Sequence, residues 1–260
     1  WMMEFKVGIY EDMPFEEYNE IPAYRASDIK DVDKCLYTWK NRKGFKDSPA
    51  LLEGRVQHTV FLEFHNFHKE FIIEPKFDRR TKDGKTAHAE FLEEVGNLTP
   101  IPRSLYDTCM ERRETIVDLV PDGKDDRTEL TLCYLYHGHP FKSRLDWYDG
   151  KRVWDLKTCR DASPRGFKQA INNFRYHMQA SLYLDACRAV GLPAEGFSFL
   201  AQEKAQPYPY VVYEMSKEAL KYGEAKNEQA LHALLKAKET GEYLPYNVKG
   251  IQTVELGDLY

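Results

Sequence analysis

The sequence of 260 residues has no hydrophobic run that approaches the roughly eighteen apolar residues needed to cross a membrane. Residues 1–4 also lack the charged and apolar regions of a secretory signal peptide. We therefore expect a protein that works away from membranes. A chain that begins with tryptophan also suggests a fragment of a longer protein.

Cysteine is scarce, and its spacing excludes several classes of protein. The five cysteines are scattered without a C-x-x-C pair, and none follows Cys187. An odd number with such spacing is unusual for a secreted disulfide scaffold, so we expect a protein of the reducing cytoplasm. The lack of later cysteines also argues against a C-terminal iron–sulfur cluster.

Excess positive charge is missing as well. The net charge is −5 and the isoelectric point is near 6.0, whereas proteins that bind nucleic acid usually present a basic surface. Basic residues are nevertheless grouped at 40–46 and 79–85. Each group is typical of a solvated loop or helix end, but could also line an inner wall that faces DNA.

The remaining pattern predicts one mixed α/β domain over residues 27–260, after an extended lead-in over 1–26. Helices are expected at 28–43, 49–65, 102–119, 163–191 and 216–240. Strands are expected at 129–136, 141–148, 151–158, 196–202 and 210–215. The polar composition of residues 71–100 predicts an interrupted segment with a mobile loop at 76–85. Residues 243–260 are expected to form a tail that packs on the domain or on a neighbour.

The most informative stretch starts at Asp146, where acids and a lysine fall on two expected strands joined by a turn at Asp149-Gly150. Because side chains alternate along a strand, Asp155 and Lys157 share one face, and the turn brings Asp146 beside them. The apolar neighbours of Asp155 indicate partial burial, and a buried acid needs a metal or a partner. This arrangement favours metal-assisted phosphodiester hydrolysis. A lone D-x-K triplet is also typical of a solvated charge pair.

The spacing from Asp146 to Asp155-Leu-Lys157 resembles the core of the PD-(D/E)xK nucleases, in the branch of RecB-like and phage-type exonucleases. Gly54-Arg-Val-Gln-His58 resembles the G-x-x-x-H helix of that branch, and Gln179-Ala-Ser-Leu-Tyr183 resembles its Q-x-x-x-Y helix. The overall pattern is similar to the nuclease domains of the RecE (exonuclease VIII) type. The resemblance implies an αβββαβ core, a central mixed sheet flanked by helices, with extra N-terminal helices.

The resemblance also implies a metal site. Asp146, Asp155 and the carbonyl of Leu156 would bind Mg²⁺, and Lys157 would position the hydroxide. His58 would be a further ligand, although nitrogen suits Mn²⁺ better than Mg²⁺. Without the motif, a lone histidine is most often a satisfied core or surface residue.

Three further residues have two readings each. Gln179 and Tyr183 lie one turn apart and would hold the substrate backbone or support the lysine, but a tyrosine on a helix is usually core packing. Glu129 stands where some relatives carry an extra acid, and is equally compatible with a charge at a strand edge.

Arg25 and Ser27 stand at a predicted helix start and resemble the 5′-phosphate pocket of phage exonucleases. Free amides and the positive dipole end of a helix favour phosphate there. Ser27 is also a natural N-cap, which would explain it without any ligand.

The family resemblance implies a Mg²⁺-dependent 5′-to-3′ exonuclease that acts on double-stranded DNA ends and leaves a 3′ strand for recombination. It also implies a homotetrameric ring and a RecT-like single-strand annealing protein as partner. A DNA endonuclease on the same core and a non-catalytic nucleic-acid-binding subunit are the alternatives.

Overall fold

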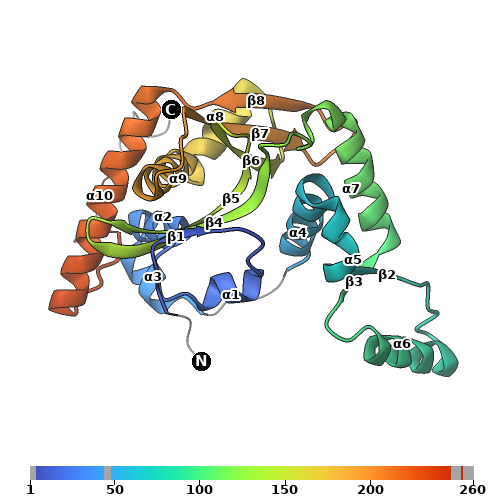
Figure 1. The fold of residues 1–260 in the computed structure, drawn as a ribbon. Helices are drawn as coiled ribbons and strands as arrows, with labels where there is room; N and C mark the ends of the chain where they lie inside the picture. The colour runs from blue at the N-terminus through green and yellow to red at the C-terminus, as the bar shows by residue number, and fades with distance from the viewer. Residues whose placement is uncertain (1–3, 44–47, 247–252, 254–260) are drawn as a thin grey trace.

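A six-stranded mixed sheet forms the centre of the computed structural model, which describes residues 4–43, 48–246 and 253 (Figure 1). The strand order is β1-β4-β5-β6-β7-β8. The strands are β1 (Gly8–Tyr10), β4 (Arg127–Tyr136), β5 (His139–Tyr148), β6 (Arg152–Cys159), β7 (Gly196–Glu203) and β8 (Tyr210–Glu214). Neighbours pair antiparallel except β6 and β7, which are parallel because a helical crossover joins them. The mixed sheet with helices confirms the predicted fold class.

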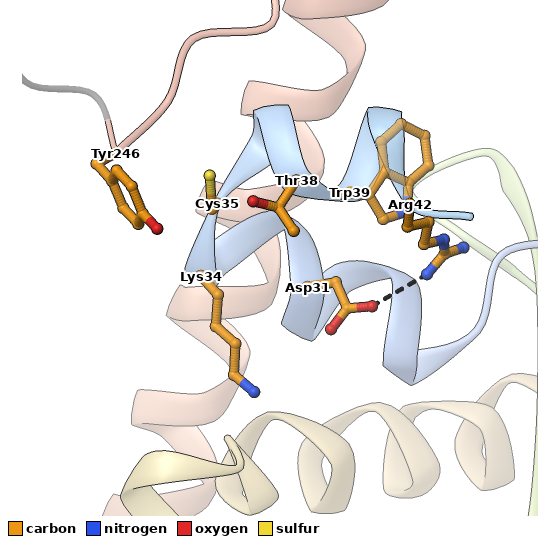
Figure 2. Close-up of a pocket in the computed structure, with 7 residues that line it drawn as sticks. All are labelled: Asp31, Lys34, Cys35, Thr38, Trp39, Arg42 and Tyr246. Atoms are coloured by element: carbon orange, nitrogen blue, oxygen red, sulfur yellow. Dashed lines mark hydrogen bonds and ion pairs between the residues drawn. The ribbon is translucent and has the colours of Figure 1, made fainter. Parts of the chain in front are cut away.

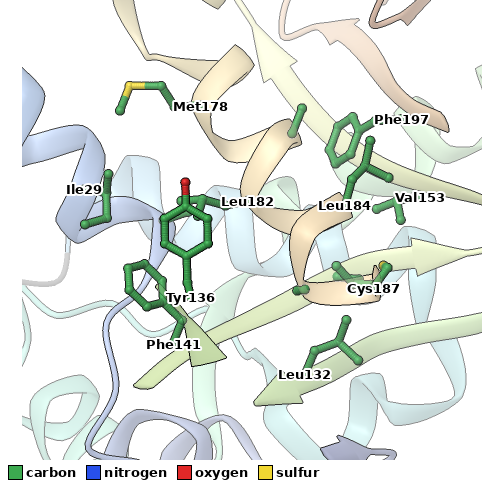
Figure 3. Close-up of a cluster of buried hydrophobic side chains, with 14 of the residues drawn as sticks. Ile29, Leu132, Tyr136, Phe141, Val153, Met178, Leu182, Leu184, Cys187 and Phe197 are labelled. Carbon is green, nitrogen blue, oxygen red and sulfur yellow. The ribbon is translucent and has the colours of Figure 1, made fainter. Parts of the chain in front are cut away.

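One face of the sheet is covered by helices that share its largest apolar core. The helices on this side are α2 (Ala26–Lys34), α3 (Leu36–Asn41), α8 (Pro164–Asn173), α9 (Tyr176–Val190) and α10 (Lys217–Thr240). Figure 3 shows Leu182 and Cys187 of α9 facing Leu132, Val153 and Phe197 of the strands. This packing fixes α9 against the middle of the sheet.

The opposite face is covered by α4 (Pro49–Leu62), whose Phe61 packs with Trp147 and Leu156. Next to α4 lies a smaller lobe with its own core around Val56. Its elements are η1 (Phe64–Asn66), α5 (Phe67–Glu70), β2 (Phe71–Glu74), α6 (Lys82–Glu94), β3 (Thr99–Pro102), α7 (Arg103–Thr115) and η2 (Val117–Leu119). Within the described residues, no helix has the length and apolar character to cross a membrane.

Three sequence predictions of local structure between residues 28 and 191 are wrong. The helix expected at 28–43 breaks at Cys35, and the one at 163–191 breaks before Tyr176. Residues 71–100 hold two strands and a helix in place of an interrupted polar segment. Periodicity misses the two helix breaks because a short stretch in a non-helical conformation leaves the apolar spacing intact. Most of the tail predicted at 243–260 lies outside the described residues.

The N-terminal segment is not the extended lead-in that the sequence predicts. It contributes β1 to the sheet and α1 (Phe15–Glu20) to its edge. Lys142 of β5 anchors it, because the buried ammonium donates to the carbonyl oxygens of Tyr18 at 2.6 Å, Asn19 at 3.1 Å and Ile21 at 2.7 Å. These bonds satisfy the end of α1, whose last carbonyls have no helical partner.

Replacing this lysine should destabilise the whole fold. Lys142→Met removes the donor from three carbonyl oxygens, of which that of Ile21 keeps the Ala23 N–H as a partner. We expect this loss to cost about 2–3 kcal/mol of unfolding free energy. Chemical denaturation of both proteins measures the difference. Lys151→Met, at an exposed lysine in the turn before β6, is the control and should unfold as the wild type does. A Lys142→Met protein of unchanged stability would contradict the anchoring role.

Candidate functional site

Three acids lie in one row across β4, β5 and β6. β5 and β6 pair at Trp147–Trp154 and at Tyr148–Val153, so the next opposed pair in register is Asp146 and Asp155. The strands separate at this row, which leaves the backbone of β6 free to bond elsewhere. The N–H of Leu156 accordingly donates to Asp146 Oδ2 at 2.9 Å.

Glu129 completes the row from β4. The pairs on either side, Thr128–Trp147 and Leu130–Leu145, place it opposite Asp146. Its φ of 50° lies in the left-handed region, which is rare for a residue other than glycine and marks a local distortion of the strand. Arg144 donates to the Glu129 carboxylate and to the carbonyl oxygen of Met13.

His58 reaches this row from α4 and forms a potential metal cluster with two of the acids. Its Nδ1 lies 3.6 Å from Asp146 Oδ2 and 3.9 Å from Glu129 Oε1. One atom from each of the three side chains falls within 4.8 Å of the others. The other ring nitrogen, Nε2, lies 3.2 Å from the carbonyl oxygen of Leu156. The family resemblance implies this carbonyl as a ligand, and the structure brings it to the same histidine.

Asp155 lies beside the cluster and is completely buried. Its Oδ1 is 2.5 Å from the Lys157 ammonium, and its Oδ2 accepts a hydrogen bond of 2.5 Å from Gln179 Nε2. Among the described side chains, Oδ1 is one of the buried oxygens without a hydrogen bond of good geometry. A buried carboxylate oxygen in this state is suited to bind a cation.

The charges of the site perturb the protonation of its groups. Burial and the nearby charge of Asp155 raise the pKa of Asp146 to about 7. Burial alone would lower the pKa of His58, but the charges of Asp146 and Glu129 outweigh it and raise the pKa to about 9. Burial also opposes the charged form of Lys157, yet the adjacent Asp155 raises its pKa. Crowded acids of this kind fit a divalent cation, which would neutralise them.

Lys30 is a member of this network that the sequence did not point to. It lies on α2, and its ammonium donates to Gln179 Oε1 at 3.2 Å. Because an ammonium only donates, it turns the Gln179 amide so that the NH₂ group faces Asp155. Burial and the charge of Lys157 lower the pKa of Lys30 to about 8. A single lysine without a motif gives no sequence signal of this role.

The other predicted site residues lie further out. Tyr183 lies one turn after Gln179 on α9, where it packs 6.1 Å from the ring of Phe197. Burial and nearby negative charges raise its pKa well above the usual value. The glycine of the G-x-x-x-H motif, Gly54, has room for a side chain, since an added Cβ would meet nothing within 4 Å.

The start of α2 differs from the prediction. Arg25 is the N-cap, and its N–H donates to the side chain of Asp28 at 2.9 Å. Ser27 is exposed in the first turn, so the expectation that it caps the helix is wrong. The Arg25 guanidinium donates to Asn19 Oδ1 at 3.1 Å. Asp28, and not Ser27, provides the capping side chain, because its carboxylate lies three residues after the N-cap Arg25 and can reach the Arg25 amide.

A pocket of about 250 Å³ lies elsewhere, between α2, α3 and Tyr246 (Figure 2). Its wall contains the Cys35 thiol and the ion pair of Asp31 with Arg42 at 3.0 Å. None of the site residues discussed above lines it. The candidate active site is therefore the row of acids with Lys157, and this pocket is not part of it.

The profile of a PDDEXK-like domain of unknown function (DUF3799) matches residues 22–252. The chain belongs to this family. The PDDEXK-like fold explains why the acids lie on neighbouring strands and why the lysine follows two residues after the second of them. The chain thus has the core of a nuclease superfamily, in agreement with the resemblance seen in the sequence.

One solved structure agrees with this assignment at the level of the fold. The PDDEXK-like chain is similar to a Eubacterium rectale protein described as a "Putative exonuclease", with 16% identity and a TM-score of 0.60. The match covers 96% of this chain and 98% of the other. A second structure, SSO0001, is 13% identical over 71% of this chain and 88% of its own, but its TM-score of 0.30 supports no argument. No curated protein matches the chain.

Proposed function

We propose that this PDDEXK-like protein is a metal-dependent exodeoxyribonuclease that degrades linear duplex DNA from the 5′ end, as enzymes of the RecE type do. The observation that carries the proposal is the meeting of His58, Glu129 and Asp146 beside the buried pair of Asp155 and Lys157. Clustered ligands next to a fixed ammonium suit hydrolysis of a phosphodiester.

The chain's own residues divide the work. Asp146, Asp155 and the Leu156 carbonyl, with His58, would hold Mg²⁺ or Mn²⁺, which supplies charge neutralisation and activation of water when bound. The Lys157 ammonium, held by Asp155, positions the attacking water and stabilises the charge that develops on the phosphate.

Gln179 and Lys30 keep this arrangement in place. Gln179 fixes one oxygen of Asp155, and Lys30 fixes the orientation of the Gln179 amide. The second oxygen of Asp155 therefore stays directed at Lys157. A ligand whose orientation is fixed in advance binds without reorganisation.

The polarity of the reaction and its partners rest on the resemblance alone. We propose a homotetrameric ring in the cytoplasm, with a RecT-like annealing protein that receives the 3′ strand. The basic residues grouped at 40–46 and 79–85 offer less free positive charge to DNA than their number suggests. Arg79 pairs with Glu74, Arg80 with Asp78 and Arg42 with Asp28.

Linear duplex DNA labelled separately at each strand end tests the proposal. Loss of the 5′ label first, in Mg²⁺ and not in EDTA, is the expected result. A covalently closed circle should remain intact, because it offers no end. Cutting of the circle would favour the endonuclease, and DNA binding without any cutting would favour the non-catalytic subunit.

We expect the first turn of α2 to recognise the 5′ end. Arg25 is 38% exposed and Ser27 lies beside it, so both can contact a terminal phosphate, although Asp28 offsets part of the charge. Ends that carry a 5′-phosphate should be degraded faster than 5′-hydroxyl ends, and Arg25→Ala should reduce this preference several-fold. Initial rates on the two duplexes measure it.

Arg103→Ala, at an exposed arginine of α7, is the matched control and should keep the preference. Equal rates of the wild type on the two ends would assign Arg25 and Ser27 a purely structural role.

A further inference from the structure

Phe174 is a large apolar side chain on the surface, at the break between α8 and α9. Its side chain is 53% exposed, although phenylalanine usually lies in the core. The next residue, Arg175, is left-handed with φ 55° and ψ 43°. This conformation is unfavourable for a residue other than glycine. The Arg175 guanidinium holds it by donating to Asp33 at 2.9 Å and to the Asn172 carbonyl at 3.2 Å.

A stack of aromatic rings connects Phe174 with the candidate active site. The rings of Phe174 and Tyr176 are stacked at 5.5 Å and 26°. The centre of the Tyr176 ring also lies 5.3 Å from the centre of the Phe199 ring and 4.9 Å from the Lys157 ammonium. Lys30 lies 5.7 Å from the same ring. Phe174 is therefore the exposed outer ring of the stack, and Tyr176, the inner ring, contacts Lys157 of the candidate active site.

Positive charge accompanies this stack. The Lys34 ammonium lies 5.9 Å from the centre of the Phe174 ring. Lys157 and Lys30 lie further in, beside the ring of Tyr176, so positive charge continues from the outer end of the stack to its inner end. Aromatic faces with adjacent basic groups bind single-stranded nucleic acid with little sequence preference.

We propose that Phe174 is a stacking platform for an unpaired base of the DNA end, at a nucleotide next to the phosphate held in the active site. The inference rests on the proposed nuclease function and adds a binding site for the base. A phenyl ring has no hydrogen-bonding groups, so the platform accepts any base. It also holds the end base away from its partner strand, which favours entry of one strand.

A duplex with 2-aminopurine as its 5′-terminal base, bound in Ca²⁺, tests the platform. The fluorescence should change on binding to the wild type and to Phe174→Trp, which keeps an aromatic face. Phe174→Ala and Phe174→Leu should lose this change and bind the end about tenfold more weakly, which corresponds to about 1.4 kcal/mol. Tyr210→Ala, at an aromatic residue of β8 that is 43% exposed, is the control and should bind normally.

Cleavage of a duplex with an abasic 5′-terminal nucleotide gives a second measurement. The wild type should remove this nucleotide more slowly than a normal one, whereas Phe174→Ala should treat the two ends alike. Normal binding and fluorescence in Phe174→Ala, with cleavage intact in the wild type, would overturn the platform alone. A wild type that neither binds nor cuts DNA would overturn the proposed function with it. A changed oligomeric state of Phe174→Ala would assign the ring to a contact between copies instead.

Discussion

Lys157→Met should reduce cleavage of linear duplex DNA by at least about 100-fold, or about 2.7 kcal/mol of transition-state stabilisation. The side chain is held at 2.5 Å by Asp155 and lies against the ring of Tyr176, so its charge has one fixed position at the site. Asp155→Asn should have an effect of the same size, since it removes a buried charge between the lysine and Gln179. Single-turnover rates at saturating enzyme measure both losses.

Binding and stability are the controls for these two variants. Both variants break the buried pair of Lys157 and Asp155 and should unfold at a lower midpoint than the wild type, but should stay folded and bind duplex DNA under the conditions of the assay. Lys151→Met, at an exposed residue in the turn directly before β6, should cut at the normal rate. A variant at Lys157 or Asp155 that retained a tenth of the wild-type rate would lose only about 1.4 kcal/mol, too little for an essential group.

Removal of divalent metal should abolish cleavage. EDTA should stop the reaction, Mn²⁺ should restore it, and Ca²⁺ should bind without turnover because its larger, looser shell positions water poorly. His58→Ala and Glu129→Gln should each weaken Mn²⁺ binding by roughly 10–100-fold, as calorimetry would measure. Cleavage in EDTA at the wild-type rate would contradict a metal-dependent mechanism.

Metal binding should also depend on pH in a definite direction. In the metal-free protein the pKa of Asp146 is about 7 and that of His58 about 9, so protons compete for both ligands. Binding of Mn²⁺ releases these protons, and its affinity should therefore rise with pH from below 7 to about 9. Calorimetry in buffers of different ionisation enthalpy measures the protons released. Affinity that is flat over this range would exclude His58 as a ligand.

The strands of the candidate site were predictable because their signal is local. Asp146, Asp155 and Lys157 lie on two neighbouring strands, and alternation along them fixes which side chains share a face. The contribution of Glu129 is harder to foresee, since it depends on the register of a third strand and on a left-handed residue within it. Lys30 depends on the docking of α2 against α9, which no spacing along the chain encodes.

The helix breaks and the small lobe were missed for a different reason. The left-handed Arg175 is held by Asp33, a residue far away in the sequence, so the local pattern gives no sign of it. The segment with β2, α6 and β3 has few buried side chains, and its polar composition predicts a loop. Short elements that are stabilised by a neighbouring lobe give weak periodicity.

The place of β1 at the margin of the sheet has a consequence for handling the protein. β1 pairs with β4 at Gly8–Cys133, Ile9–Leu132 and Tyr10–Thr131, and so covers the outward N–H and C=O groups in the middle of this ten-residue strand. A chain shortened to begin at residue 27 would lose this cover and bare a long, largely apolar strand edge. Such an edge pairs readily with edges of other molecules. We expect the shortened protein to aggregate even though His58, the three acids and Lys157 all remain in it.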